Sequence, residues 1–511
     1  MQKSISFLCF LLLAVLTKAA VHIDVTKFGA VGDGKVMNTQ AIQTAIDSCS
    51  AQGGGKVVFP AGTWLSGTLL LKTGVTLYLD EKATLLGSTD IADYKVVDGF
   101  KDGLGQAMGY CFIGAVDVQN VGLEGLGTID GQGKLVRESG GKDRRPFLIR
   151  FVRCNNVSVK EVRLTGPTAW TLHLFRCKNI IADKVVIRSR GLGNNDGIDI
   201  DCCEDVVIRN CDIDSGDDAI CFKTTSPFPC KNVLIENIHI FTREGAIKFG
   251  TESAGNFENI KVKNIEIMFA REGGIKLFSV DGSKMKNIEI SDVVMHKAHL
   301  PIIVRLGARM KTFRPGDPKL EVGSISNVKI RNVKVYDGDW IGILMSGIPG
   351  HNIDGLTMEN IDINVTGKGT LDDAKLKPEE KIDAYPEIYI FGRRLPAYGM
   401  YLRHAQNITM KNVNLHIDST DARPAIIATD IANITLTDWK LSTNNSQEPL
   451  INLDAAKNIA LTNITPSAKP ATFLSVTGKE SKKITVKQSK WGEKAAVKLA
   501  DEVEKGTVVF N

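Results

Sequence analysis

Residues 232–262 read NVLIENIHIFTREGAIKFGTESAGNFENIKV and contain two copies of one short motif. The motif is Asn or Asp, then Val or Ile, one variable residue and another apolar residue. Its copies begin at Asn156, Asn179, Asp205, Asn232, Asn259, Asn287, Asn327, Asn352, Asn407, Asn433 and Asn458, mostly 23–28 residues apart. A repeat of this length is typical of a solenoid. Because the runs are short and β-branched, with no helical pattern between them, the sequence predicts an all-β, right-handed parallel β-helix. We interpret the recurring Asn as a side chain that stacks from coil to coil.

Two intervals between copies are longer, at 40 and 55 residues. They predict loops near 306–321 and 366–398, both rich in aromatic residues and Arg, which we expect to shape a binding cleft. Ahead of the repeats, Asn38-Thr39 is a plausible helix cap and Gln40 to Cys49 is amphipathic, which indicates a short amino-terminal capping helix. Residues 21–511 are therefore expected to form a single catalytic domain.

The first 20 residues have the pattern of a signal peptide. Lys3 precedes an apolar run from Ile5 to Leu16, which is too short to span a bilayer. We therefore expect an exported protein, periplasmic or secreted, with no membrane span, and a monomer. Beyond residue 20 there are nine cysteines, an odd number, which we interpret as packed thiols with at most one or two bridges. A net charge of +5 without a basic cluster argues against nucleic acid as a partner.

Carboxylates are concentrated between Asn194 and Lys223. This stretch holds Asp196, Asp199, Asp201, Glu204, Asp205, Asp212, Asp214, Asp217 and Asp218. Asp196 and Asp217 are 21 residues apart, about one coil, and each precedes a β-like run. Three carboxylates are therefore expected to share one patch, in which crowding raises at least one pKa, as cleavage of a glycosidic bond requires. Strand alternation would separate Asp217 from Asp218, so both reach one cleft only if a turn or bulge precedes the strand.

At this stretch the chain resembles the polygalacturonase-type pectinases, glycoside hydrolase family 28, as a divergent, bacterial-like member. FGAVGDG and GGGKVVFPAG resemble the family's amino-terminal cap, and GLGTIDGQG at 125–133 resembles an early coil. NND at 194–196 matches the family's N-T-D motif, and GDD at 216–218 matches its G-D-D motif. The resemblance implies that Asp217 is the general acid and that Asp196 and Asp218 hold the attacking water. It also implies inversion at the anomeric carbon, with acid and base roughly 6.5–9.5 Å apart, and no cofactor.

Two elements depart from the family's pattern. Glu244 occupies the place of the family's histidine, and in the R-I-K element, which contacts the substrate carboxylate in family members, Lys276 replaces Arg and Phe278 replaces Lys. Glu244 and Lys276 remain candidates for substrate binding, as do His173 and Arg305 from their places in neighbouring coils. Loss of the cationic fork favours a different pectic linkage, such as a rhamnogalacturonan-type one, or exo-action.

The predicted function is hydrolysis of α-linked, galacturonic-acid-containing pectic polysaccharide or oligosaccharide. Two other classes stay open. A pectate-lyase-like β-eliminating enzyme would need a calcium-binding acid cluster beside a basic catalytic residue. A non-catalytic carbohydrate-binding β-helix would use the acids as a calcium site or a solvated face.

Overall fold

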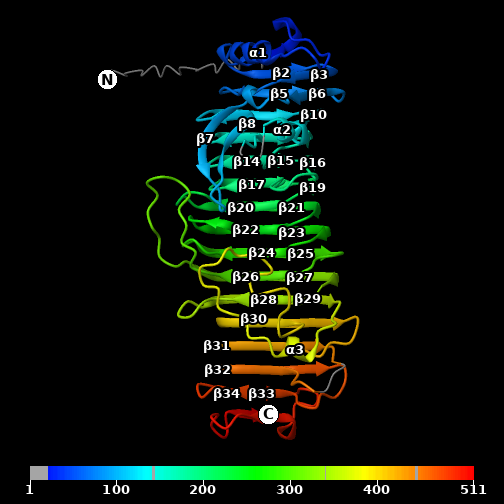
Figure 1. Cartoon of the computed structure of the whole chain (residues 1–511), viewed down its shortest axis with the longest axis vertical. Helices are drawn as coiled ribbons and strands as arrows, with labels where there is room; N and C mark the ends of the chain where they lie inside the picture. Colours follow the sequence, from blue (N-terminus) through cyan, green and yellow to red (C-terminus); the bar gives the residue numbers. More distant parts are fainter. Residues whose placement is uncertain (1–20, 141–143, 340, 444–446, 511) are drawn as a thin grey trace, which may run out of the picture.

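The computed structural model describes residues 21–140, 144–339, 341–443 and 447–510, so the expected signal peptide at residues 1–20 lies outside the described part. The chain winds into a right-handed parallel β-helix, as the repeat predicted, with α1 at the top and the last coils at the bottom (Figure 1). Every strand pair but one is parallel, and successive coils stack in register over three sheets.

Sheet I carries the candidate site. It holds β4 (Leu69–Leu70), β8 (Ala107–Val116), β11 (Phe147–Val152), β14 (Leu172–Phe175), β17 (Ile198–Asp201), β20 (Ile220–Thr224), β22 (Gly245–Ser253), β24 (Gly273–Ser279), β26 (Ile302–Leu306), β28 (Ile343–Ser346), β33 (Leu474–Thr477) and β35 (Val497–Leu499). Sheet II holds β1 (Val21–Asp24), β2 (Gly55–Phe59), β5 (Val75–Leu79), β9 (Gln119–Glu124), β12 (Asn155–Lys160), β15 (Lys178–Asp183), β18 (Glu204–Arg209), β34 (Lys482–Lys487) and β36 (Val508–Phe510).

Sheet III closes the coil with shorter strands. It holds β3 (Gly62–Ser66), β6 (Ala83–Gly87), β10 (Thr128–Asp130), β13 (Arg163–Thr165), β16 (Val186–Arg188) and β19 (Asp212–Ser215). Lower in the rod, longer strands turn from sheet II into sheet III: β21 (Cys230–Thr242), β23 (Phe257–Ala270), β25 (Lys284–Met295), β27 (Ser324–Gly338) and β29 (Ile353–Val365). Three strands run through all three sheets: β30 (Met400–Ile417), β31 (Ile426–Leu441) and β32 (Ile451–Pro466).

Helices are few and short. They are η1 (Val25–Phe28), α1 (Thr39–Ala51), η2 (Ile91–Asp93), α2 (Gly133–Gly140), α3 (Leu371–Ala374) and η3 (Lys494–Ala496). The expected capping helix is α1, which buries Ile42 and Ile46 against the first coils. The Asn38 side chain makes no cap hydrogen bond. Instead it accepts from Val31 N at 2.7 Å, which ties down the loop before the helix.

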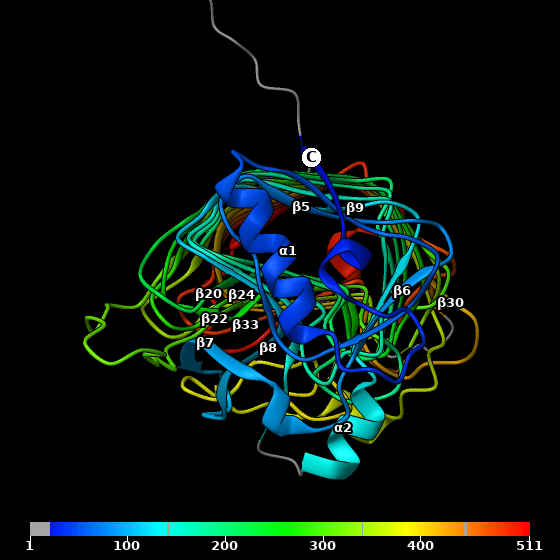
Figure 2. The ribbon, with the colours of Figure 1, turned by 90° about the horizontal axis from the view of Figure 1, so that it is seen from above.

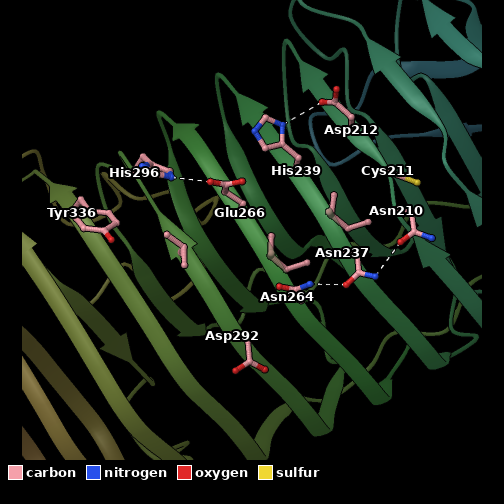
Figure 3. A pocket seen from close by; sticks show the side chains of 13 residues that line it. Asn210, Cys211, Asp212, Asn237, His239, Asn264, Glu266, Asp292, His296 and Tyr336 are labelled. Carbon is pink, nitrogen blue, oxygen red and sulfur yellow. Dashed lines mark hydrogen bonds and ion pairs between the residues drawn. The ribbon is translucent and has the colours of Figure 1, made fainter.

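The recurring Asn side chains form ladders along the outside of the rod, as expected. Asn259 Nδ2 donates to Asn232 Oδ1 at 3.2 Å. A second ladder, visible in Figure 3, joins Asn264 to Asn237 at 2.6 Å and Asn237 to Asn210 at 3.0 Å. All five have φ between 54° and 57°, in the left-handed region that Asn tolerates better than most residues. The same residue type therefore makes the corner of each coil and links it to the next.

The interior of the rod is a continuous apolar core of stacked Ile, Val, Leu and Phe. All nine described cysteines are buried free thiols, so the described part holds no disulfide: Cys49, Cys111, Cys154, Cys177, Cys202, Cys203, Cys211, Cys221 and Cys230. Within the described ranges, no helix has both the length and the hydropathy needed to cross a membrane.

Several excursions from the coils gather on one side of the rod. Figure 2, looking down the rod, shows α2, β7 and the yellow segment that includes 366–398 on this side. β7 (Lys95–Lys101) folds back antiparallel on β8 as a hairpin. Among them, the tip of the β7–β8 hairpin and the 366–398 segment line the cavity at the carboxylate stretch.

Candidate active site

The three expected catalytic carboxylates lie in two stacked turns at the start of sheet I strands. Asp196 precedes β17, and Asp217 and Asp218 precede β20. Ile198 pairs with Ile220, so Asp196 stands one coil from Asp218 in the same register. Because Asp217 and Asp218 occupy a turn, strand alternation does not separate them, and one oxygen of each of the three carboxylates lies within 4.8 Å of the others.

The two adjacent acids have different hydrogen-bond partners. Asp218 Oδ2 accepts from Lys248 Nζ at 2.7 Å, and its Oδ1 accepts from Gly245 N at 2.9 Å. Asp217 accepts only from the backbone among the described residues: Oδ2 from Asn194 N at 2.8 Å and Oδ1 from Asp218 N at 2.9 Å. A cation therefore contacts one acid and not the other.

This difference sets opposite proton affinities. Burial and the neighbouring Asp218 carboxylate raise the pKa of Asp217. Burial alone would raise the pKa of Asp218 too, but the positive charges of Lys248, Lys276 and Lys223 outweigh it, and the pKa of Asp218 falls below its usual range. The pair thus joins an acid whose pKa is raised to one whose pKa is lowered, and a difference of this sign is what acid and base catalysis on one bond requires.

Asp196 belongs to a second buried cluster. Lys223 Nζ lies 3.3 Å from Asp196 Oδ2, 3.5 Å from Asp199 Oδ1 and 3.3 Å from Glu252 Oε2. Burial and the Asp199 carboxylate raise the pKa of Asp196, and burial raises the pKa of Asp199 to about 8. Within the described part, Asp196 Oδ1 and both Asp199 oxygens lack a hydrogen-bond partner. One lysine facing several buried acids leaves a proton on the Asp196–Asp199 pair.

The three acids open into one cavity of about 290 Å³. Its lining is Asp102, Leu104, Trp170, Asn194, Asp196, Asp217, Asp218, Lys223, Glu244, Lys248, Glu252, Glu272, Tyr385, Glu387 and Tyr389. Trp170 lies beside Lys223, whose Nζ is 4.2 Å from the centre of the Trp ring.

The tip of the β7–β8 hairpin closes one side of the cavity. Gly103 N donates to Glu252 Oε1 at 2.7 Å, and Gly103 O accepts from Lys311 Nζ at 2.6 Å. A Cβ at Gly103 would lie 2.7 Å from Glu252 Oε1, so a larger residue here would displace the Glu252 carboxylate. Lys311 belongs to the 306–321 loop. That loop was expected to shape the cleft, but it contributes no residue to the cavity lining and instead supports the hairpin.

The 366–398 loop contributes Tyr385, Glu387 and Tyr389 to the lining on another side of the cavity. Lys276 is fully buried beneath it, with Nζ 2.5 Å from Glu387 Oε2. The cavity lining does not include Lys276, whose ammonium group binds this loop.

Arg305 also binds the 366–398 loop. Its guanidinium donates to Glu380 O at 3.0 Å and Lys381 O at 2.7 Å, and to Ser346 Oγ at 2.8 Å and Gly347 O at 2.9 Å in the coil below. Arg305 does not line the cavity and is 1% exposed. Its position is that of a residue that anchors the loop.

Glu244 and His173 have different surroundings. Glu244 lines the cavity and pairs with Arg271, and burial together with the charges of Asp217 and Asp218 raises the pKa of Glu244 to about 8. His173 lies behind the cavity, fully buried. Its Nε2 is 3.2 Å from Asp201 Oδ2, and its ring centre is 5.0 Å from that of Trp170. His173 is not part of the cavity lining, but it packs against Trp170, which is.

Sequence reasoning missed both lysines of the lining and four of its acids, Asp102, Glu252, Glu272 and Glu387. Lys223 and Lys248 lie in sheet I strands at positions whose side chains point away from the core. Each is a single charged residue in an otherwise apolar run, and this pattern could have indicated a functional lysine. Glu252 and Glu387 lie far from the motif in sequence and reach the cavity only through β22 and the long loop. Asp199, which the sequence places in the same carboxylate stretch, is fully buried.

A bound cation fits this site poorly. Asp196, Asp217 and Asp218 have metal-ligand spacing, as do Asp196, Asp199 and Cys221. Yet Lys248 Nζ is 2.7 Å from Asp218, and Lys223 Nζ is 3.3 Å from Asp196. The two ammonium groups already neutralise these acids, and their positive charge would repel a divalent cation.

A larger hollow of about 830 Å³ lies elsewhere on the rod, around the Asn210 ladder (Figure 3). There His239 Nδ1 is 3.4 Å from Asp212 Oδ1, and His296 Nε2 is 3.0 Å from Glu266 Oε1. These pairs are exposed, and each is worth about 1 kcal/mol or less. The three carboxylates and the buried lysines are not part of this hollow.

A parallel β-helix with carboxylates gathered in a cavity on one side is the arrangement expected of a β-helical glycosidase. Residues 49–380 match the family described as glycosyl hydrolases family 28, and the chain belongs to this family.

Curated relatives carry related names. A "Probable polygalacturonase" of Vitis vinifera is 31% identical over 265 residues, which are 44% of this chain and 54% of that protein. An "Exo-poly-alpha-D-galacturonosidase" of Dickeya chrysanthemi is 26% identical over 251 residues, 39% of this chain and 41% of that protein. The chain spans about half the length of these curated relatives.

Solved structures show the same fold. An exopolygalacturonase from Thermotoga maritima superposes with a TM-score of 0.60 at 21% identity, covering 78% of this chain and 92% of that chain. A family 28 exopolygalacturonase from Yersinia enterocolitica has a TM-score of 0.59 at 20% identity, covering 86% of this chain and 78% of that chain.

Proposed function

We propose that the protein hydrolyses α-linked glycosidic bonds in galacturonic-acid-containing pectic polysaccharide or oligosaccharide. The observation that carries this is the opposite pKa shift of two adjacent acids, Asp217 and Asp218, in the cavity of a family 28 chain. Asp217 gives its proton to the leaving glycosidic oxygen. Asp218, ionised beside Lys248, takes a proton from the attacking water, and Asp196 holds that water by a hydrogen bond.

Exo-action is the second part of the proposal. The cavity of about 290 Å³ is walled by the β7–β8 hairpin and the 366–398 loop, so it suits a chain end better than the middle of a long polymer. The names of the Dickeya, Thermotoga and Yersinia relatives agree with this. Incubation with pectic polysaccharide should release small sugars from the start while viscosity falls slowly. A rapid fall in viscosity with few new reducing ends would contradict exo-action.

Inversion is the third part, implied by the family resemblance. One oxygen of each of the three acids lies within 4.8 Å of the others, and this nearest approach is a different quantity from the separation of whole carboxyl groups, roughly 6.5–9.5 Å, that is typical of inverting enzymes. Proton NMR of the first products tests this directly. A β-anomer released first from an α-linked substrate supports inversion. An α-anomer released first would mean retention and would contradict this part of the proposal.

β-Elimination is the rival reaction. It would require a basic catalytic residue, but Lys223 and Lys248 both contact carboxylates. We expect new reducing ends without products that absorb in the ultraviolet; an unsaturated, absorbing end would support the rival. Binding without turnover would instead support a non-catalytic carbohydrate-binding rod.

The setting of the enzyme is also proposed. Residues 1–20 would direct export and be removed, and residues 21–511 would act as one catalytic domain and as a monomer. Amino-terminal sequencing of the exported protein and light scattering test these points. A mature chain that retains residues 1–20, or a stable dimer, would contradict them.

A further inference from the structure

The cavity has a particular balance of charge. Of the fifteen residues that line it, eight are Asp or Glu and two are Lys, and none is Arg or His. For a site that takes acidic sugars, a surplus of positive charge would be the ordinary arrangement, since complementary charge favours the right partner and like charge rejects it.

Each lysine at the site is already matched by acids. Lys248 Nζ lies 2.7 Å from Asp218 Oδ2 and 3.5 Å from Glu387 Oε1. Lys223 Nζ contacts Glu252 at 3.3 Å in addition to the Asp196–Asp199 pair. Behind the lining, Lys276 contacts the other oxygen of Glu387 at 2.5 Å.

Two acids of the lining have raised pKa values, which shows that further negative charge in the cavity is unfavourable. Burial, then the charges of Asp217 and Asp218, raise the pKa of Glu244 to about 8, although Glu244 pairs with Arg271. Burial raises the pKa of Glu272 as well. Asp218, Glu252 and Glu387 contact the three lysines, and outside the lining Arg271 pairs with Glu244 and Glu272. A substrate carboxylate entering the cavity would have to compete with these carboxylates for every nearby cation.

We propose that the sugar held in this cavity, whose glycosidic bond is cleaved, is uncharged: a neutral sugar, or a galacturonate with an esterified carboxyl group. This rests on the proposed hydrolysis and specifies its substrate. The galacturonate of the pectic chain then lies on the leaving-group side, outside the cavity. The carboxylates suit sugar hydroxyls, which are hydrogen-bond donors. Trp170, Tyr385, Tyr389 and Leu104 give the cavity aromatic and apolar walls for a sugar face, a methyl group or a methyl ester.

The first experiment uses matched α-linked disaccharides that share a galacturonate at the reducing end. The other sugar is galacturonate, its methyl ester, galactose or rhamnose. We expect kcat/KM for at least one uncharged sugar to exceed that for galacturonate by about ten-fold or more, because like charge in a desolvated site is costly. The ester and neutral-sugar arms show which source of an uncharged sugar the site accepts.

The second experiment alters the acid that occupies two lysines. Glu387→Gln releases Lys248 and Lys276 from their shared partner, so discrimination against free galacturonate should fall by several-fold. Glu379→Gln is the matched control on the same loop, because the Glu379 side chain is 75% exposed and pairs only with Lys381 among the described residues. The control should leave the ratio of the two kcat/KM values unchanged.

Binding is measured separately from chemistry by calorimetry on the Asp217→Asn variant with the same disaccharides. Tighter binding and faster hydrolysis of the free galacturonate compound would overturn the inference and leave the proposed hydrolysis intact. If no disaccharide and no pectic polymer yields reducing ends, the proposed function itself fails, and the inference fails with it.

Discussion

Lys248 Nζ lies 2.7 Å from Asp218 Oδ2, while Asp217, one residue earlier, accepts hydrogen bonds only from the backbone among the described residues. Two acids adjacent in sequence therefore have opposite pKa shifts. Lys248 comes from the next coil, in the register that pairs it with Cys221. The stacking of coils, together with the turn before β20, thus gives two neighbouring acids different surroundings.

Asp217→Asn should reduce kcat by about 100-fold to 10,000-fold, the usual contribution of a general acid. The fold should remain, because Asp217 only accepts hydrogen bonds from the adjacent turns. Initial rates on a pectic substrate and a thermal melt measure the two effects. Asp214→Asn is the control, since Asp214 pairs with Arg190 at 2.7 Å outside the cavity. Unchanged turnover in Asp217→Asn would remove it from the role of general acid.

Lys248→Met should change the pH dependence of kcat/KM. Activity requires ionised Asp218, and Lys248 helps to hold the pKa of that carboxyl low, so the wild type keeps its activity as the pH falls. Without the cation the pKa of Asp218 rises, and the acid limb should move up by about one unit or more. Lys261→Met is the control, because Lys261 is half exposed and pairs with Glu289 at 3.7 Å. An acid limb that stays in place would show that Asp218 is not the group titrating there.

Gly245→Ala should lower kcat, because the added methyl group would displace the Asp218 carboxylate. A Cβ at Gly245 would lie 2.7 Å from Asp218 Oδ1 and 2.8 Å from Lys276 Cδ, so the carboxylate must move. We expect kcat to fall by about 100-fold, as for a misplacement near 1 Å. Gly193→Ala is the matched control in the turn before Asp196, where an added Cβ meets nothing within 4 Å. Equal losses in both variants would argue against a specific effect on Asp218.

Arg305→Lys should loosen the 366–398 loop, because a lysine cannot reproduce the donations to Glu380 O and Lys381 O together with those to the coil below. We expect KM to rise more than kcat falls, and proteolysis to cut within 366–398 sooner than in the wild type. Arg331→Lys, on the exposed face of β27, is the control. If protease sensitivity is unchanged, Arg305 does not hold the loop.

The fold could be predicted from the repeat because each coil buries the same apolar pattern. Asn recurs at the corners because each corner needs a residue that tolerates the left-handed backbone conformation. Asp196, Asp217 and Asp218 were found for a related reason: their spacing is about one coil, so adjacent coils must bring them together. The sequence predicted His173 and Arg305 as substrate-binding candidates, but it could not tell that His173 packs against Trp170 or that Arg305 binds backbone carbonyls of a loop.

The sequence by itself determined the β-helix and the meeting of three carboxylates, since both follow from periodicity along the chain. Only the tertiary structure decided the direction in which each acid's pKa is shifted and the balance of charge in the cavity lining. Those properties depend on Lys223, Lys248, Glu252 and Glu387, which come from other coils and a long loop. Electrostatic energies in a buried site depend on distances of a few ångströms and on the extent of desolvation. The amino-acid sequence specifies neither quantity directly.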